Sequence, residues 1–199
     1  PFFTFGIEWG QLSFAIGAYN CYFPYSPASL VAGQWQHIAV TRSTNKTLTY
    51  YINGVPTVYS NLLYFDGNFN NGNAVDIGRW VEYWAAQYLG EMDEIRVWNV
   101  ARSAAEIQGG MARPISRSDS GLVAYFRLDE GSGSTTYNNS SVTSFNGTLV
   151  GSPLRTLSGA MTPLAPTGIT ANAVGQDAIG VRWNANAEND LSYYVVYRS

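Results

Sequence analysis

Short runs in which apolar and polar residues alternate, separated by turn residues, recur from one end of the chain to the other. This period of two is typical of β-strands that bury one face. Residues 2–8 and 12–18 are the first such runs, and the interval Trp9-Gly10-Gln11 is short enough for a β-hairpin. By the same criterion, further strands are expected at residues 35–42, 47–52, 55–59, 75–79, 90–99, 122–128 and 145–150.

A second hairpin is expected around Asn53-Gly54. Both positions of this dipeptide tolerate positive φ, which makes it the strongest short signal for a tight turn between strands. Pro56 follows in the returning run and has no amide hydrogen to donate to a ladder. The strand over residues 55–59 is therefore expected at a sheet edge or at a bulge.

One segment predicts a helix. Ser103-Ala104-Ala105-Glu106 has the pattern of a capping box, in which the serine and glutamate side chains each accept from the other's backbone amide. Ile107 and Met111 lie four residues apart and are expected to face the sheet. Pro114 is expected to end the segment.

Composition favours the all-β class. Aromatic residues make up 15% of the chain and charged residues only 13%, a balance that suits pleated sheets and polar turns. The net charge of -3 and the scattered Lys and Arg argue against a nucleic-acid partner. Cys21 is the single cysteine, so an intrachain disulfide is excluded. No apolar run approaches the roughly 18 residues of a membrane span.

The composition changes near residue 151, where Ser, Gly, Leu, Thr and Pro begin to dominate, and three more strand-like runs follow this stretch. A complete immunoglobulin-like sandwich needs about 100 residues, so the last part of the chain holds only the start of one. We therefore divide the chain into a first domain over residues 1–152, a linker over 153–166 and a partial second domain over 167–199.

Three stretches carry a family resemblance. One joins Trp35-Gln36-His37-Ile38-Ala39-Val40 to Tyr51-Ile52-Asn53-Gly54, and another joins Ile77-Gly78-Arg79 to Met92-Asp93-Glu94-Ile95-Arg96-Val97-Trp98-Asn99. The third is Gly121-Leu122-Val123-Ala124-Tyr125-Phe126 with the residues up to Gly133. In this order they resemble laminin-G-like domains of the concanavalin A-like, pentraxin-type superfamily. The resemblance implies a two-sheet antiparallel jelly-roll sandwich with one short helix, whose first strands precede Pro1.

The tail, from Ala165-Pro166-Thr167 through Arg182-Trp183 to residues 191–198, is similar to the first three strands of fibronectin type III domains. This similarity implies the start of an immunoglobulin-like β-sandwich after the linker. The two resemblances together are typical of bacterial multidomain surface proteins. They imply a location that is extracellular or at the cell surface.

The sequence offers little support for a catalytic function. The resemblance extends to glucanases of the same fold, whose catalytic strand carries a motif of three carboxylates. In this chain, Glu91-Met92-Asp93 supplies the first two of the three. The third position falls on Ile95 or Arg96, neither of which donates a proton at neutral pH. His37 is the only histidine, so a Ser/His/Asp arrangement has little to build on. We expect no enzyme activity and interpret Asp93 as a residue that orders loops or backbone amides.

Calcium is the candidate cofactor. The loop that begins at Asp66 offers oxygen ligands at alternate positions. It departs from a helix-loop-helix calcium loop, because Asn71 stands where Gly is needed and Ile77 where a bidentate Glu is needed. The alternative is that the Asn and Gly residues only permit a tight turn. The candidate metal ligands are Asp66, Asn68 and Asn70.

Aromatic side chains crowd two loops of the first domain. Exposed rings stack on the apolar faces of sugars, while amide side chains bind hydroxyl groups. The alternative is that these rings cap the sandwich or are buried against a neighbouring domain. The candidate ligand-binding residues are Trp80, Tyr83, Trp84, Gln87, Tyr22 and Tyr25.

The sequence thus predicts a non-catalytic binding or adhesion module that recognises a glycan or a surface protein, with calcium assistance as an option. Two alternatives stay open. The first is a structural spacer or assembly subunit of a surface filament or secreted complex, whose partners are neighbouring domains or subunits. The second is an accessory module of a polysaccharide-degrading enzyme.

Overall fold

The structure is a computed structural model of the 199-residue chain. It describes residues 3–16, 24–59, 75–79, 87–142, 145–156, 160, 168–174 and 179–184. The strands of the first part are β1 (Phe3–Glu8), β2 (Gln11–Ile16), β3 (Ile38–Arg42), β4 (Leu48–Ile52), β5 (Val55–Tyr59), β6 (Ile95–Trp98), β7 (Leu122–Phe126), β8 (Thr135–Thr136) and β9 (Gly147–Thr148). The helix α1 spans Ala104–Gly110, and the tail contains β10 (Thr170–Ala173) and β11 (Ile179–Arg182).

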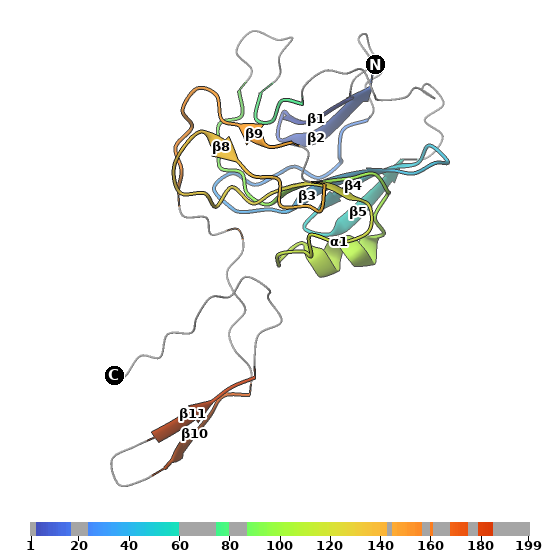
Figure 1. The fold of residues 1–199 in the computed structure, drawn as a ribbon. Coiled ribbons are helices and arrows are strands. Elements are labelled where there is room, and N and C mark those ends of the chain that lie inside the picture. Colours follow the sequence, from blue (N-terminus) through green and yellow to red (C-terminus); the bar gives the residue numbers. More distant parts are fainter. Residues whose placement is uncertain are drawn as a thin grey trace.

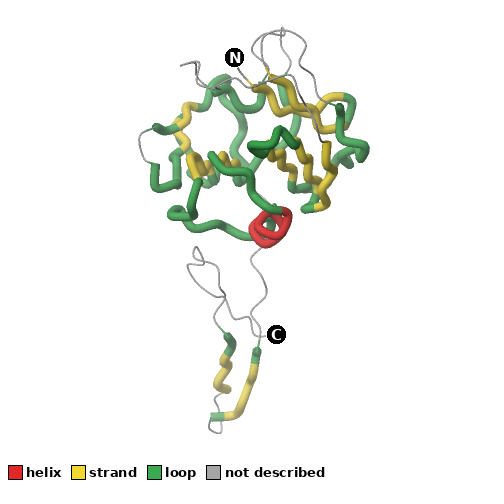
Figure 2. The backbone as a smooth tube through the Cα atoms, turned by 90° about the vertical axis from the view of Figure 1, so that its right-hand side faces the viewer, coloured by secondary structure: helices red, strands yellow, loops and turns green. Residues whose placement is uncertain are grey.

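Every strand pair among the described residues is antiparallel. The strands form the pairs β1-β2, β6-β7, β8-β9 and β10-β11 and one three-stranded sheet in the order β3-β4-β5 (Figure 1). This arrangement, with α1 as the one helix in the described part, confirms the predicted all-β class. In both views the β10-β11 hairpin lies apart from the other described strands (Figures 1 and 2).

Both predicted hairpin turns have the same backbone conformation. Asn53 and Gly54, between β4 and β5, have φ of 51° and 75°. Trp9 and Gly10, between β1 and β2, have φ of 54° and 77°. Two successive residues with positive φ are the mark of a two-residue type I′ turn, whose twist matches that of the paired strands. The strand register follows from these turns, with Glu8 opposite Gln11 and Ile52 opposite Val55.

The main hydrophobic core lies between the β1-β2 hairpin and the three-stranded sheet. Leu12 and Phe14 of β2 are buried against Leu48 and Tyr50 of β4. Since side chains alternate along a strand, Leu12 and Phe14 lie on one face of the β1-β2 hairpin, and Leu48 and Tyr50 lie on one face of the three-stranded sheet. These two faces pack against each other. The partly buried hydrophobic residues around this cluster are Phe5, Leu30, Ile38, Val40, Ile52 and Tyr59.

The helix α1 lies beside the turn between β4 and β5. Its capping box is formed as predicted, with the Ser103 hydroxyl accepting from the Glu106 amide and the Glu106 carboxylate accepting from the Ser103 amide. Ile107 is buried, and the Gln108 side-chain amide donates to the Gly54 carbonyl oxygen at 3.0 Å. The helix thereby joins the edge of the three-stranded sheet to the segment after β6.

Two strand predictions need correction. Residues 75–79 form no strand and contribute only an isolated bridge from Arg79 to Gln87. The run over 90–99 is a strand only from Ile95, because Glu94 has a φ of 54° and breaks the extended backbone. The predicted edge position of β5 is confirmed by the order β3-β4-β5. Of the three tail strands, the last one lies outside the described residues.

Candidate functional site

A shallow depression of about 170 Å³ opens where the chain leaves β7. Leu128 has a φ of 60°, in the left-handed region, and lies between Arg127 and Asp129, two residues that line the depression. This volume lies below the range of about 300–1,000 Å³ that is usual for drug-sized ligands, so the depression does not enclose a ligand of that size. We call it the Tyr137 depression; it is lined by Arg127, Asp129, Glu130, Tyr137 and Asn139.

The floor of the Tyr137 depression is held by Glu130. Its carboxylate accepts hydrogen bonds from the Thr136 hydroxyl at 2.9 Å and from the Tyr137 amide at 2.7 Å, and it pairs with Arg155 at 3.0 Å. Burial alone would raise the pKa of Glu130, but these three donors lower it below its usual value. Glu130 is therefore a fixed anion that positions the Tyr137 backbone.

Asp129 is the exposed acid of the depression, with 55% of its side chain accessible to solvent. The Arg127 guanidinium lies 2.8 Å from its carboxylate and favours the ionised form. Partial burial, with smaller contributions from Asp93, Glu94 and Glu130, nevertheless raises the pKa of Asp129. The carboxylate is accessible to a ligand and is oriented by a neighbouring cation.

Tyr137 and Asn139 form the rim on the opposite side. Tyr137 is 56% exposed, although it belongs to a tightly bonded segment. The Asn139 amide donates to the Tyr125 carbonyl of β7 at 2.7 Å, and the Asn139 side chain donates to the Tyr137 carbonyl at 3.1 Å. The phenol ring is thus presented to solvent on a backbone that β7 holds in place.

Between these two residues lies Asn138, whose side chain binds the backbone of β7 as a neighbouring strand would. Its Oδ1 accepts from the amides of Tyr125 and Ser140 at 3.0 and 3.1 Å. Its Nδ2 donates to the Val142 carbonyl at 2.6 Å, and the side chain is buried. Because buried backbone groups need partners, this amide fixes the rim more firmly than a solvent-exposed loop could be fixed.

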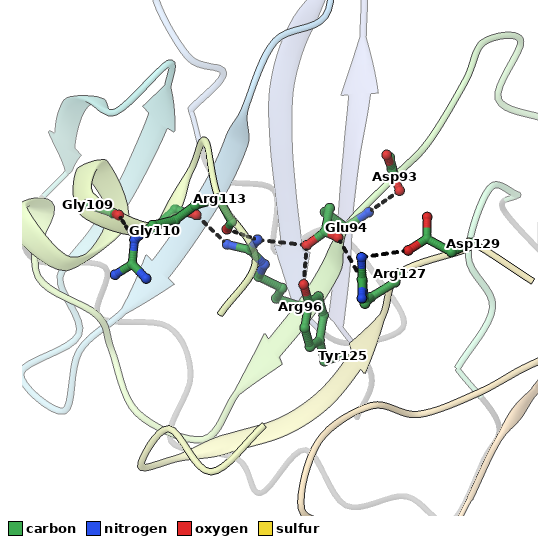
Figure 3. A network of polar contacts seen from close by, with 9 residues as sticks. All are labelled: Asp93, Glu94, Arg96, Gly109, Gly110, Arg113, Tyr125, Arg127 and Asp129. Carbon is green, nitrogen blue, oxygen red and sulfur yellow. Dashed lines mark hydrogen bonds and ion pairs between the residues drawn. The ribbon is translucent and has the colours of Figure 1, made fainter. Parts of the chain in front are cut away.

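A second polar cluster is centred on Glu94 and shares Arg127 and Asp129 with the depression (Figure 3). The Glu94 carboxylate lies 2.8 Å from the Arg96 guanidinium and 3.5 Å from that of Arg127, and it also accepts from the Tyr125 hydroxyl. Burial together with the Glu94 carboxylate raises the pKa of Tyr125. Since Arg127 contacts both Glu94 and Asp129, the cluster supports the wall of the Tyr137 depression.

Arg96 connects this cluster to the helix. Its guanidinium donates to the carbonyl oxygens of Gly110 and Arg113 at 2.7 and 2.8 Å, at and just beyond the C-terminal end of α1. A cation at this end also complements the helix dipole. Its side chain is only 11% exposed, which makes Arg96 a structural residue.

The glucanase-like carboxylate pair is not completed by the described residues around it. Glu91 is exposed, and the Asp93 carboxylate accepts from the Glu94 amide at 2.9 Å. Asp93 thus orders a backbone amide, as predicted. Glu94 lies on the side of Arg96 and is held there by three donors.

Of the six predicted ligand-binding residues, two are described. Tyr25 is 38% exposed and donates its hydroxyl hydrogen to Glu8 at 2.9 Å, while Gln87 is exposed opposite Arg79. The other four, Tyr22, Trp80, Tyr83 and Trp84, lie outside the described residues, as do the predicted calcium ligands Asp66, Asn68 and Asn70. Within the described ranges, no group of three or more His, Cys, Asp or Glu side chains is placed to hold a metal ion.

A family model described as the concanavalin A-like lectin/glucanases superfamily matches residues 2–108, which is more than half of the chain. The chain belongs to this superfamily. The matched region of this concanavalin A-like protein contains both hairpins and most of α1, whereas the Tyr137 depression follows it in the sequence. The superfamily includes enzymes and non-enzymes, so membership leaves the activity open.

Among solved structures, the concanavalin A-like chain is similar to residues 221–444 of an S-layer domain-containing protein from Clostridium thermocellum ATCC 27405. The two are 29% identical, with a TM-score of 0.34, over 50% of this chain and 51% of that one. This chain therefore spans about half the length of the solved one. A comparison with curated proteins gives no match. In the part of the chain that is described, no helix has the length and apolar character needed to cross a bilayer.

Sequence reasoning missed the Tyr137 depression. It placed a strand over residues 122–128 but gave no role to the acids that follow. Two carboxylates directly after a strand, with a tyrosine and an asparagine a few residues later, were an available signal. The contact that builds the site, Arg155 with Glu130, joins residues 25 positions apart and has no signature in the sequence.

Proposed function

We propose that this chain is a non-catalytic glycan-binding module, and that the Tyr137 depression is its binding site. The observation that carries the proposal is a half-exposed phenol ring beside an exposed carboxylate and an amide on a rigid frame. An aromatic face stacks on the C–H face of a sugar ring, whereas carboxylate, amide and guanidinium groups bind its hydroxyls. Tyr137, Asp129 and Asn139 supply the ring, the acceptor and the amide.

Preorganisation supports this assignment. Glu130 and Asn138 hold the backbone on both sides of Tyr137 before any ligand arrives. A ligand therefore does not bear the entropic cost of ordering the loop, which is a major loss in weak polar binding sites. The open shape of the depression suits the end or one exposed residue of a polysaccharide better than a deeply enclosed small molecule.

The environment of the acids supports a binding role rather than hydrolysis. A retaining glycosidase needs a nucleophile and a proton donor about 5–5.5 Å apart across the scissile bond. Here Glu94 is engaged by Arg96, Arg127 and Tyr125, and Asp93 accepts from a backbone amide. These contacts hold both carboxylates in place, which is what structural acids require.

The wider context we propose is a multidomain protein at the cell surface. The segment after residue 156 contains the Ser/Pro-rich stretch and then the β10-β11 hairpin, whose register pairs Thr170 with Arg182. This hairpin agrees with the first two strands of the proposed fibronectin type III domain.

Polysaccharide retention tests the proposal. We would measure the mobility of the 199-residue chain in native gels containing laminarin, xylan, mannan or galactan, and its co-sedimentation with chitin and peptidoglycan. The expected result is retention by at least one polymer. Tyr137→Ala should weaken it about tenfold or more, while Tyr137→Phe should retain most of it because the ring is kept. Asp129→Asn should weaken it by losing the charged acceptor.

Asp76→Asn is the matched control for Asp129→Asn. Asp76 forms an exposed 2.8 Å ion pair with Arg79, like that of Asp129 with Arg127, but it does not line the depression. Wild-type retention is expected for this variant. The proposal is wrong if no polymer retains the wild type, or if Tyr137→Ala and Asp129→Asn bind as well as Asp76→Asn.

Calcium assistance is a separate proposal that depends on Asp66, Asn68 and Asn70. An ion that binds only the folded state raises the melting temperature in proportion to its binding free energy. The expected result is a higher melting temperature in millimolar calcium than in chelator, lost in Asp66→Asn. Equal melting temperatures in the two buffers would exclude the ion.

A further inference from the structure

The two type I′ turns have the same backbone conformation but differ in the residue at the first turn position. At the first turn position, Asn53 has a φ of 51° and Trp9 has a φ of 54°, and each is followed by a glycine. Asparagine is favoured there because its short polar side chain tolerates the left-handed region. Tryptophan is bulky and is disfavoured in the same conformation. The β1-β2 turn therefore carries strain that the β4-β5 turn avoids.

Burial does not offset this strain. Trp9 is 90% exposed, the largest exposure of any described aromatic side chain among the exposed hydrophobic residues. Its ring gains almost no packing in the folded chain, so neither local conformation nor the core accounts for its presence. Strained residues that persist without a structural benefit are concentrated at sites of function.

We propose that Trp9 is a second glycan-contact residue, whose indole stacks on the face of a pyranose ring. This inference rests on the proposed function of the chain as a glycan-binding module. It extends that function from one depression to two separate contacts, with Trp9 at the tip of the β1-β2 hairpin and Tyr137 after β8. Two weak contacts on one polysaccharide would bind with an effective concentration that neither has alone.

The surroundings of Trp9 fit a sugar. The adjacent Glu8 carboxylate accepts from the Tyr25 hydroxyl at 2.9 Å, and the Tyr25 carbonyl accepts from the Tyr59 hydroxyl at 2.8 Å. The Glu8 carboxylate, one residue before Trp9 in the sequence, is thus held by Tyr25 and keeps lone pairs that can accept from sugar hydroxyls, as does the Tyr25 hydroxyl oxygen. Tyr25, which the sequence predicts to be a ligand-binding residue, belongs to this group.

The size of the contact also favours a sugar over a protein. One indole offers at most about 250 Å² of surface. A stable protein interface needs about 800 Å² from each partner. A single ring at the tip of a two-stranded ribbon falls far below that area, whereas it matches one face of a monosaccharide unit.

The test uses four variants of the 199-residue chain and the polysaccharide panel described above. Trp9→Asn restores the residue type of the other turn, and Trp9→Ala removes the ring without supplying a favoured turn residue. Trp9→Phe keeps a ring, and Tyr137→Ala reports on the depression. Each variant is measured for retention by the polymer that retains the wild type and for its melting temperature.

We expect Trp9→Asn to raise the melting temperature by about 2–4 °C while weakening retention about tenfold. Trp9→Ala should weaken retention equally with a smaller gain in melting temperature, and Trp9→Phe should retain most binding. Wild-type retention by Trp9→Asn, with loss in Tyr137→Ala, overturns this inference and leaves the proposed function intact. An unchanged or lower melting temperature of Trp9→Asn overturns the strain argument and the inference with it. Absence of retention for the wild type overturns both proposals.

Discussion

The guanidinium of Arg155 lies 3.0 Å from the Glu130 carboxylate, and both side chains are largely buried. The same guanidinium donates to the carbonyl oxygens of Gly133 and Thr135, each at 3.2 Å. Arg155 belongs to the stretch that sequence reasoning assigns to the linker. The chain after β9 is therefore bound back onto the loop that forms the floor of the Tyr137 depression.

Replacing Arg155 should destabilise this region. Arg155→Ala leaves the Glu130 carboxylate partly buried without its cation and frees two carbonyl oxygens, at a cost of about 2 kcal/mol. Arg155→Lys should cost less, since it keeps the charge but loses the planar fork that reaches both carbonyls. Urea unfolding measures both free energies. Arg79→Ala, which breaks the exposed pair with Asp76, is the control and should cost under about 1 kcal/mol. Equal stability of the two alanine variants would contradict a stabilising role for the contacts of Arg155 with Glu130, Gly133 and Thr135.

Stability should fall on mild acidification because of His37. Burial, with a smaller contribution from the Arg96 charge, lowers the pKa of His37 from 6.5 to about 4. Its Nδ1 is buried and has no hydrogen-bond partner among the described residues, so a proton there is unfavourable. The unfolded chain therefore binds more protons between these two values. The stabilising effect is complete above pH 6.5 and is lost as the pH falls toward 4.

Thermal melts at pH 7.0, 6.0 and 5.0 measure this dependence. The lowered pKa of Glu130 acts only below about pH 4.5, and the raised pKa of Asp129 acts with the opposite sign. The difference between the wild type and His37→Gln over the window from 6.5 to 5 isolates the histidine. His37→Gln should melt at nearly the same temperature at all three values, and a wild-type melting temperature that is flat across this window would refute the prediction.

Arg96 should be among the most sensitive charged residues of the described chain. Arg96→Met removes the nearer of the two arginines that pair with the largely buried Glu94 carboxylate, and it removes the donor to the Gly110 and Arg113 carbonyls, with an expected loss of about 3 kcal/mol. The double variant Glu94→Gln with Arg96→Met should recover part of this loss, because it leaves no buried unpaired charge. Guanidinium unfolding of Arg96→Met, of Glu94→Gln and of the double variant measures the three losses of stability. A double variant that is less stable than the sum of its parts would contradict the assigned pair.

Asn138 should couple stability to binding. Asn138→Ala leaves the Tyr125 amide and the Val142 carbonyl without their side-chain partner, at a cost of about 2 kcal/mol. Because Tyr137 and Asn139 flank this residue, retention by polysaccharide should weaken even at temperatures where the variant is folded. Asn45→Ala, in the exposed β3-β4 turn, is the control for retention. If folded Asn138→Ala is retained as strongly as the wild type, Asn138 does not position Tyr137 and Asn139 for polysaccharide binding.

The sequence predicted the elements whose signals are local. Asn53-Gly54 identified a turn through two positive φ values, and Ser103 with Glu106 identified the first turn of α1 through a reciprocal cap. The hairpin around Trp9 was found from spacing alone, since tryptophan itself does not favour the conformation that it adopts. Each of these signals lies within a few residues, so propensity and pattern suffice.

Features that depend on distant partners were not predictable in this way. The strand β8 has only two residues, too few for any periodicity, and it is defined by its pairing with β9, which retains two residues of the predicted strand over 145–150. The predicted strand over 90–99 lost its first half because Glu94 turns toward Arg96, Arg127 and Tyr125. The depression depends on Arg155, whose contact with Glu130 exists only in the folded chain.

The most direct test of the binding account is a ¹H–¹⁵N NMR titration of the chain with oligosaccharides from the retaining polymer. The account predicts saturable shifts of the backbone amides of Asp129, Tyr137 and Asn139, which vanish in Tyr137→Ala, and no new reducing-end signals during a day at 25 °C. Shifts confined to other regions, or the steady appearance of reducing ends, would contradict it.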